Sequence, residues 1–201
     1  SSVRAAVVAP DASITVEHRT ATLTDSPMAG LVEFDAAALA HAALDCALRA
    51  LADAGPVDAV GIANQRASTI VWDAATGEPV APGLGWQDLR TVGDCLVLHA
   101  DGIRLAPNLS ATKLRHLLDQ VDPDRSRDLR FGTVDTWLVW HLTEGAAHVT
   151  DFSNAAVTGL RSGDGLRWDP KLLAALNIPE GVLPTVVDSA GAIAPATALD
   201  G

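Results

Sequence analysis

Apolar and polar residues alternate in patterns that predict strands and helices in turn along the chain. Residues 4–9 and 14–22 carry apolar or β-branched side chains at alternate positions, with a polar turn between them, so we expect two paired strands. Asp35 precedes a helical repeat of apolar residues that runs to Ala54 and stops at Gly55-Pro56. The N-terminal part is therefore predicted to form a strand pair and one long helix.

A nearly continuous apolar run at residues 57–63 predicts a buried strand. It stops at two amides and a guanidinium, residues 64–66, which would lie at the carboxyl edge of a sheet, where open α/β sheets bind ligands. Residues 69–81 follow with a hairpin pattern, in which Gly77 suits a left-handed turn position. We therefore expect a ligand site directly after the 57–63 strand.

The remaining periodicity predicts further helices and strands in alternation. The expected elements are a helix at 91–100, a helix capped by Ser110, a strand at 129–134, a short buried helix at 135–142, and a helix that Asp169 caps and Asn177 ends. This order is typical of an α/β domain. Periodicity alone does not distinguish one α/β fold from another.

Composition limits the classes of function that remain. The chain has 201 residues, 48% of them hydrophobic, and a net charge of −11, which suits one globular domain and argues against a nucleic-acid surface. No apolar run reaches membrane-spanning length and no signal peptide is visible, so we expect a cytoplasmic protein without membrane partners. Cys46 and Cys95 lie in apolar helical patterns and are expected to be buried thiols, and the scattered histidines predict no metal site.

Several motifs occur in an order that has a known counterpart. They are NQR at 64–66, WQDLR at 86–90, SATK at 110–113, FGTVDTWLVWHLT at 131–143, HVTDFSNA at 148–155 and WDPKLLAAL at 168–176. Together they resemble the FGGY family of carbohydrate kinases, most of all its glycerol kinases, over nearly the whole chain. The resemblance implies an α/β fold of the ribonuclease-H-like, actin-type class, a mixed sheet with helices on both faces.

The resemblance also implies ATP and Mg²⁺ as cofactors. Ser1, Ser2 and Arg4 match the end of the family's phosphate motif, whose Asp and Gly are absent, so these residues are expected to contact the nucleotide. The family's catalytic Asp lies in a C-terminal domain. Residues 1–201 are therefore interpreted as an N-terminal domain that lacks the start of the first strand, the phosphate motif and the C-terminal domain, and that is inactive in isolation.

Four residues are implied to line the substrate. Arg66 and Trp86 match the family's substrate-binding Arg and Trp, although Arg66 has a second interpretation as a structural residue paired with an acid such as Asp88. Ala67 stands where glycerol kinases carry Glu, and Asn108 stands where they carry Tyr. Both departures predict a wider pocket that prefers a larger polyol or a sugar to glycerol.

The expected activity is ATP-dependent phosphorylation of a primary hydroxyl of a polyol or sugar. The alternatives are a kinase for a larger polyol or ketopentose and, from another class, a degenerate carbohydrate-binding module without catalysis. Actin-type and chaperone ATPases share the fold but should lack the polar loops at 64–66 and 86–90. No catalytic residue is assigned, because Asp135 and Asp151 are interpreted as structural, Asp135 as a helix cap. Whether the protein forms a homo-oligomer is left open.

Overall fold

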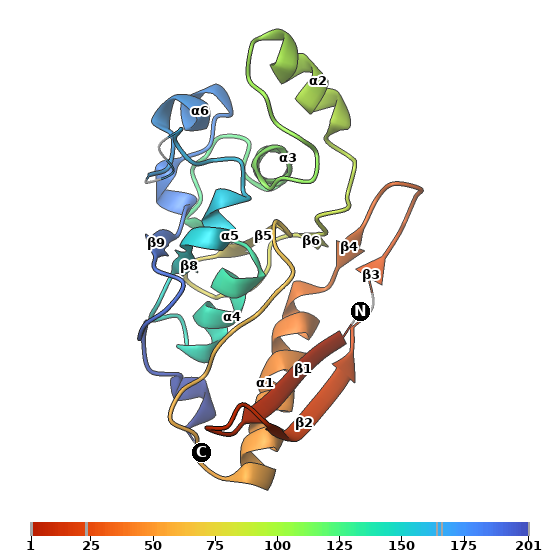
Figure 1. Ribbon diagram of the computed structural model, residues 1–201. Coiled ribbons are helices and arrows are strands. Elements are labelled where there is room, and N and C mark those ends of the chain that lie inside the picture. The colour runs from red at the N-terminus through yellow and green to blue at the C-terminus, as the bar shows by residue number, and fades with distance from the viewer. Residues whose placement is uncertain (1, 23, 164, 166, 201) are drawn as a thin grey trace.

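Strands and helices alternate along the whole chain, as the apolar pattern predicts (Figure 1). The computed structural model describes residues 2–22, 24–163, 165 and 167–200. In chain order the elements are β1 Ser2–Val8, β2 Ile14–Ala21, β3 Thr24–Asp25, β4 Glu33–Phe34, α1 Ala36–Ala54, β5 Ile70–Asp73, β6 Gly83–Leu84, α2 Val92–Ala100, α3 Ala111–Val121, β7 Leu129–Gly132, α4 Val134–Leu142, β8 Val149–Asp151, α5 Phe152–Ala156, α6 Pro170–Ala175, η1 Glu180–Val182, β9 Thr185–Val187 and η2 Thr197–Leu199. None of the described helices is long and apolar enough to cross a membrane.

The strands form several small sheets rather than one large one. Within the described residues, β1 pairs with β2, β5 pairs with β7, and β3, β4 and β6 form a third sheet, all antiparallel. The pair β8 and β9 is parallel, so the sheets are mixed in type. The α/β class is confirmed, and the strands of the implied mixed sheet are distributed over several small sheets.

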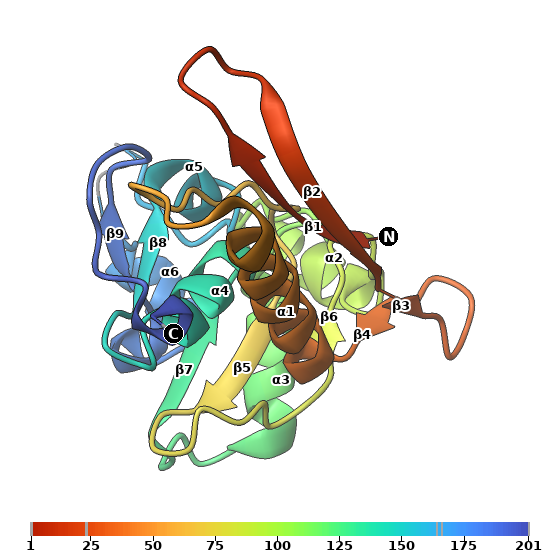
Figure 2. The same ribbon diagram turned by 90° about the horizontal axis from the view of Figure 1, so that it is seen from below.

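The N-terminal strand pair and the long helix pack on each other as expected. Asp35 caps α1 by accepting the Ala38 N–H at 2.9 Å, and the helix ends at Gly55, which has a positive φ of 83° and donates its N–H to the Leu51 carbonyl. Thr20 Oγ1 of β2 lies 3.2 Å from the Cys46 Sγ of α1, which joins the hairpin to the helix. Figure 2 shows α1 beside the β1–β2 hairpin, whose tip extends away from the other elements. Cys46 is buried, as the pattern predicts.

The predicted buried strand at residues 57–63 is wrong. The segment has no regular secondary structure, and its Val57 and Val60 are 40% and 47% exposed. A buried strand needs ladder partners on both sides, but in the part of the chain that the structure describes β1 pairs with β2, β8 pairs with β9, and neither pairs with residues 57–63. The segment instead borders a cavity of about 1150 Å³ that β8 and residues 188–200 line on its other side. An apolar run indicates only that a strand there would be stable if it were buried. Whether partner strands are available to bury it depends on distant parts of the chain.

Strand β5 lies between two hydrophobic cores. Its Ile70 and Trp72 join a cluster with α1 and α4 that includes Trp137, while Val71 points the other way into a larger cluster built on α3, β7 and α6. Alternation of side chains along a strand produces this division. The hairpin expected after β5 is confirmed, since Asp73 N–H donates to the Glu78 carbonyl at 3.0 Å and the chain turns through a left-handed Gly77.

Candidate functional site

The first turn of α3 joins the loops that carry the predicted substrate residues. Ser110 Oγ donates to the carbonyl of Ala67 at 3.2 Å. Lys113 Nζ donates to the carbonyls of Gly85 and Trp86 at 3.1 and 3.3 Å. The side chains of Ser110 and Lys113 are fully buried. Two loops that are separate in sequence are therefore held by residues one helical turn apart.

The two residues between Ser110 and Lys113 also contact residues that are far away in the sequence. The Ala111 N–H donates to the Thr158 carbonyl at 2.8 Å, and the Thr112 and Thr91 hydroxyls lie 2.8 Å apart. All four residues of the SATK motif are buried, and each bonds a different segment. Ser110 was predicted to cap α3, but it makes no cap bond because its hydroxyl is used on Ala67. The motif is a junction of segments as well as a helix start.

Arg66 is exposed on the loop that Ser110 holds. Among the described residues its guanidinium forms no ion pair or hydrogen bond, whereas the neighbouring Asn64 amide donates to Asn154 Oδ1 at 3.1 Å. The second interpretation of Arg66, pairing with Asp88, is wrong. Asp88 Oδ1 and Oδ2 accept from Arg90 at 2.8 and 2.9 Å. Arg66 therefore keeps its donors available to a ligand at the border of the large cavity.

The acid that was considered for Arg66 belongs to a buried charge network. Asp88 is fully buried and accepts the Val32 N–H at 2.7 Å, and Arg90 also donates to Glu33 at 2.7 Å. Burial opposes ionisation of Asp88, but the Arg90 guanidinium and the Val32 N–H outweigh it, so the pKa of this carboxyl is held below its usual value. The network attaches the loop after Trp86 to β4.

The other predicted substrate residues differ in exposure. Trp86 is 43% exposed and lies in the turn that Lys113 holds, and Asn108 is exposed two residues before Ser110. Ala67 is buried, with a left-handed backbone at φ 61°, and presents little of its methyl group to solvent. The structure thus brings the segments of all four residues to the start of α3, with Arg66, Trp86 and Asn108 at the surface.

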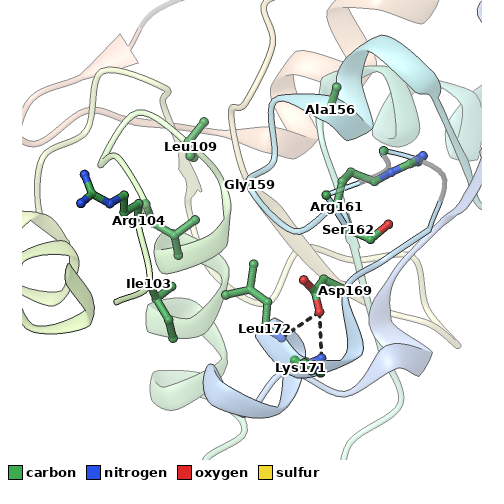
Figure 3. Close-up of a pocket in the computed structure, with 13 residues that line it drawn as sticks. Ile103, Arg104, Leu109, Ala156, Gly159, Arg161, Ser162, Asp169, Lys171 and Leu172 are labelled. Carbon is green, nitrogen blue, oxygen red and sulfur yellow. Dashed lines mark hydrogen bonds between the residues drawn. The ribbon is translucent and has the colours of Figure 1, made fainter. Parts of the chain in front are cut away.

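The Asn108 segment also borders a second hollow. It has a volume of about 640 Å³, and Ile103 and Leu109 line it together with Gly159 and Asp169 (Figure 3). A Cβ on Gly159 would lie 2.9 Å from the Leu109 side chain, and its φ of 78° also favours glycine there. The Arg104 and Arg161 side chains point in different directions in Figure 3, so they do not form one charged cluster.

Asp135 is not a helix cap, contrary to the prediction. It lies inside α4 and is buried, where it accepts from the hydroxyls of Thr133 and Thr150 and from the Asp151 N–H. Burial raises the pKa of the Asp135 carboxyl, and these donors oppose the rise. Asp151 caps α5 through the N–H groups of Ser153 and Asn154, so its structural interpretation agrees with the geometry.

The predicted nucleotide residues lie on the N-terminal strand. Ser1 falls outside the described residues, and Ser2 begins β1. Arg4 is 55% exposed on the same strand, and its guanidinium lies 3.9 Å from the Glu17 carboxylate on β2. Such a long, exposed pair adds little stability.

Lys113, Asp88 and Arg90 carry much of the site's geometry, although the sequence predicted no role for Lys113 or Arg90 and considered Asp88 only as a partner of Arg66. A signal for Lys113 was present, because it lies four residues before Leu117 on the apolar stripe of α3. A lysine on that stripe is expected to be buried and bonded. Asp88 has a local partner in Arg90, two residues further on, but its bond to the Val32 N–H joins residues that are distant in sequence.

Similarity to known proteins identifies the family of this chain. The model of the FGGY family of carbohydrate kinases, N-terminal domain, matches residues 1–198. The chain belongs to this FGGY family. It is 48% identical over 183 residues to a glycerol kinase of Aromatoleum aromaticum, an alignment that covers 82% of the chain and 37% of that relative. A glycerol kinase of Vibrio cholerae is 39% identical over 207 residues, covering 94% of the chain and 41% of the relative.

Solved FGGY structures support the same fold. The structure of Plasmodium falciparum glycerol kinase with ADP matches with a TM-score of 0.80 at 25% identity, over 91% of this chain and 40% of that one. A ligand-bound xylulose kinase from Lactobacillus acidophilus matches with a TM-score of 0.80 at 18% identity, over 92% and 40%. The ribonuclease-H-like, actin-type fold is therefore confirmed, and the chain spans about two fifths of the length of these FGGY proteins.

Proposed function

We propose that this chain is part of a cytoplasmic, ATP-dependent kinase that phosphorylates a primary hydroxyl of a polyol or sugar. The observation that carries the proposal is the first turn of α3, which holds the loops of Arg66 and Trp86 beside the segment of Asn108. A guanidinium that has no partner among the described residues, an exposed indole and an amide suit a ligand with many hydroxyl groups.

In this proposal Arg66 orients the substrate. Its planar guanidinium donates two hydrogen bonds to neighbouring hydroxyls, while the Trp86 ring packs against the carbon chain. The proton acceptor is proposed to lie outside residues 1–201, because Asp135 and Asp151 already accept several donors each. The described residues then bind and position, and chemistry requires groups from a second domain.

The proposed contact with the nucleotide rests on Arg4. Arg4 is exposed, and its long contact to Glu17 is weak enough to be replaced by a phosphate oxygen. Together with Ser1 and Ser2 it is proposed to contact ATP. No group of three acidic, histidine or cysteine side chains among the described residues is arranged to hold a metal ion. Mg²⁺ is therefore proposed to arrive with the nucleotide, where it would neutralise phosphate charge.

We further propose that the preferred substrate is larger than glycerol. Ala67 supplies no carboxylate for a hydroxyl, and Asn108 supplies no aromatic wall. A hydroxyl left without its partner weakens binding by about 1–3 kcal/mol. The relatives named glycerol kinase make glycerol the reference substrate for the test of this proposal.

The test is a substrate screen on the full-length protein with ATP and Mg²⁺, with ADP release as the readout. Glycerol is compared with four- and five-carbon polyols and ketoses, and Arg66→Ala serves as the control for contaminating enzyme. Turnover of a larger polyol or ketose above glycerol supports the proposal. Binding of these compounds without ADP release would identify a carbohydrate-binding module instead.

A further inference from the structure

Lys113 is a buried lysine whose ammonium has no carboxylate partner among the described residues. The chain has two lysines, Lys113 and Lys171. Lys171 is exposed, whereas Lys113 is fully buried and forms no ion pair within the described residues. Its ammonium donates to two successive carbonyls, those of Gly85 and Trp86. Burying an ammonium is costly unless it is well bonded, so these two contacts are needed.

The turn that Lys113 grips is constrained on its other side as well. The Gly85 N–H donates to the Val32 carbonyl at 2.8 Å, and a Cβ on Gly85 would lie 2.8 Å from the Val32 side chain. The Asp88 N–H donates to the Gly85 carbonyl at 3.0 Å and closes the turn. The Trp86 indole has no described hydrogen bond of its own. The position of the Trp86 ring therefore depends on the backbone of this turn.

We propose that Lys113 is a positioning residue for the substrate: its ammonium fixes the Gly85 and Trp86 carbonyls, and so places the Trp86 indole against the polyol or sugar. This inference rests on the proposed function, in which Trp86 lines the substrate. Lys113 is separated from substrate by the turn and acts through Trp86.

The charge, and not only the volume, of Lys113 is what positions the turn. Lys113→Met keeps an unbranched side chain of similar length but removes the donors. Among the described residues, the Trp86 carbonyl would then lose its partner, and the Gly85 carbonyl would keep only the Asp88 N–H. The turn is then expected to shift until those carbonyls reach water, and the Trp86 ring shifts with it. Lys171→Met is the matched control, because it removes the same group from an exposed site.

Titration gives a second view of the same contact. Burial lowers the pKa of Lys113 to about 8, and the nearby Asp88 and Cys95 oppose the fall while Arg90 adds to it. The other titratable groups close to this network are Glu33, which binds Arg90, and His116, one turn further along α3. Deprotonation near pH 8 weakens the ammonium's hold on the two carbonyls. The KM for substrate is therefore expected to rise as the pH passes through about 8.

The experiment compares wild type, Lys113→Met and Lys171→Met in the full-length protein, using the polyol or ketose that wild type phosphorylates fastest. We expect Lys113→Met to raise KM about tenfold with kcat changed less than about threefold, since ring contacts bind ground state and transition state alike. The rise of KM with pH should be lost in this variant only. Acrylamide quenching of Trp86, taken as the difference from a Trp86→Phe background, should increase in Lys113→Met and stay unchanged in Lys171→Met.

A folded Lys113→Met variant with the KM and Trp86 quenching of wild type would overturn the inference. If the variant does not fold, the pH dependence of wild type tests the inference. A joint change of KM and Trp86 quenching near pH 8 supports the inference. If neither quantity changes between pH 7 and 9.5, the inference is overturned. Absence of turnover in wild type would refute the proposed kinase function, while the quenching comparison would still decide the role of Lys113.

Discussion

Two Asp–Arg ion pairs in this chain have the same N–O distance, but one is buried and the other is exposed to solvent. Asp88–Arg90 and Asp45–Arg49 each have an N–O distance of 2.8 Å. The side chains of the first pair are 0% and 14% exposed, and those of the second are 61% and 44% exposed. Because solvent screens the second pair, the two aspartates should differ greatly in their contribution to the free energy of unfolding.

The perturbation is Asp88→Asn, with Asp45→Asn as its control. Asp88 also accepts the Val32 N–H, so its replacement by Asn leaves Glu33 as the remaining carboxylate on Arg90 and weakens a second bond. Breaking one side of a buried pair costs about 3–5 kcal/mol, and we expect about 3 kcal/mol because Asn keeps one acceptor. The exposed pair should contribute less than about 0.5 kcal/mol.

Urea unfolding of the purified chain, followed by circular dichroism, measures both variants. With a slope of about 2 kcal/mol per molar urea, Asp88→Asn should lower the midpoint by about 1.5 M. The low pKa of Asp88 means that its ionised form stabilises the fold above about pH 4, and this stability is lost as the pH falls through the folded-state pKa. The gap between wild type and Asp88→Asn should therefore narrow in acid. Equal losses in the two Asn variants at pH 7 would refute the reasoning.

Further predictions concern the substrate loops and the fold around them. In the full-length protein, Arg66→Ala should lower kcat/KM by about 100-fold, on the order of 3 kcal/mol, and Arg66→Lys should not restore it, since lysine cannot span two hydroxyls; a near-normal lysine variant in initial-rate assays would contradict this. Ala67→Glu with Asn108→Tyr should move preference towards glycerol, and the two changes should couple, as a double-mutant cycle of kcat/KM would show; additive effects would mean that they do not face one ligand. Gly159→Ala should cost about 2 kcal/mol in urea unfolding, because its new Cβ would meet Leu109 at 2.9 Å; a loss below about 0.5 kcal/mol would show that the contact relaxes.

Local chemistry was readable from the sequence wherever neighbours in the chain decide it. Asp35 and Asp169 cap their helices as predicted, because a cap bond joins residues two or three positions apart. Asn177 and Gly77 take left-handed backbones for the same local reason. The order of motifs was also sufficient to indicate the FGGY family, since it does not depend on how the segments pack.

Contacts between distant segments were decided only by the tertiary structure. The 57–63 run is apolar, but it pairs with none of the described strands, and its Val57 and Val60 stay exposed. Ser110 follows the pattern of a helix cap, but a carbonyl 43 residues earlier takes its hydroxyl. Lys113 binds a turn 27 and 28 residues away. The sequence around a residue indicates whether that residue will be buried or hydrogen-bonded, but the packing of the whole chain determines its partner. In this protein those partners determine the arrangement of the candidate site.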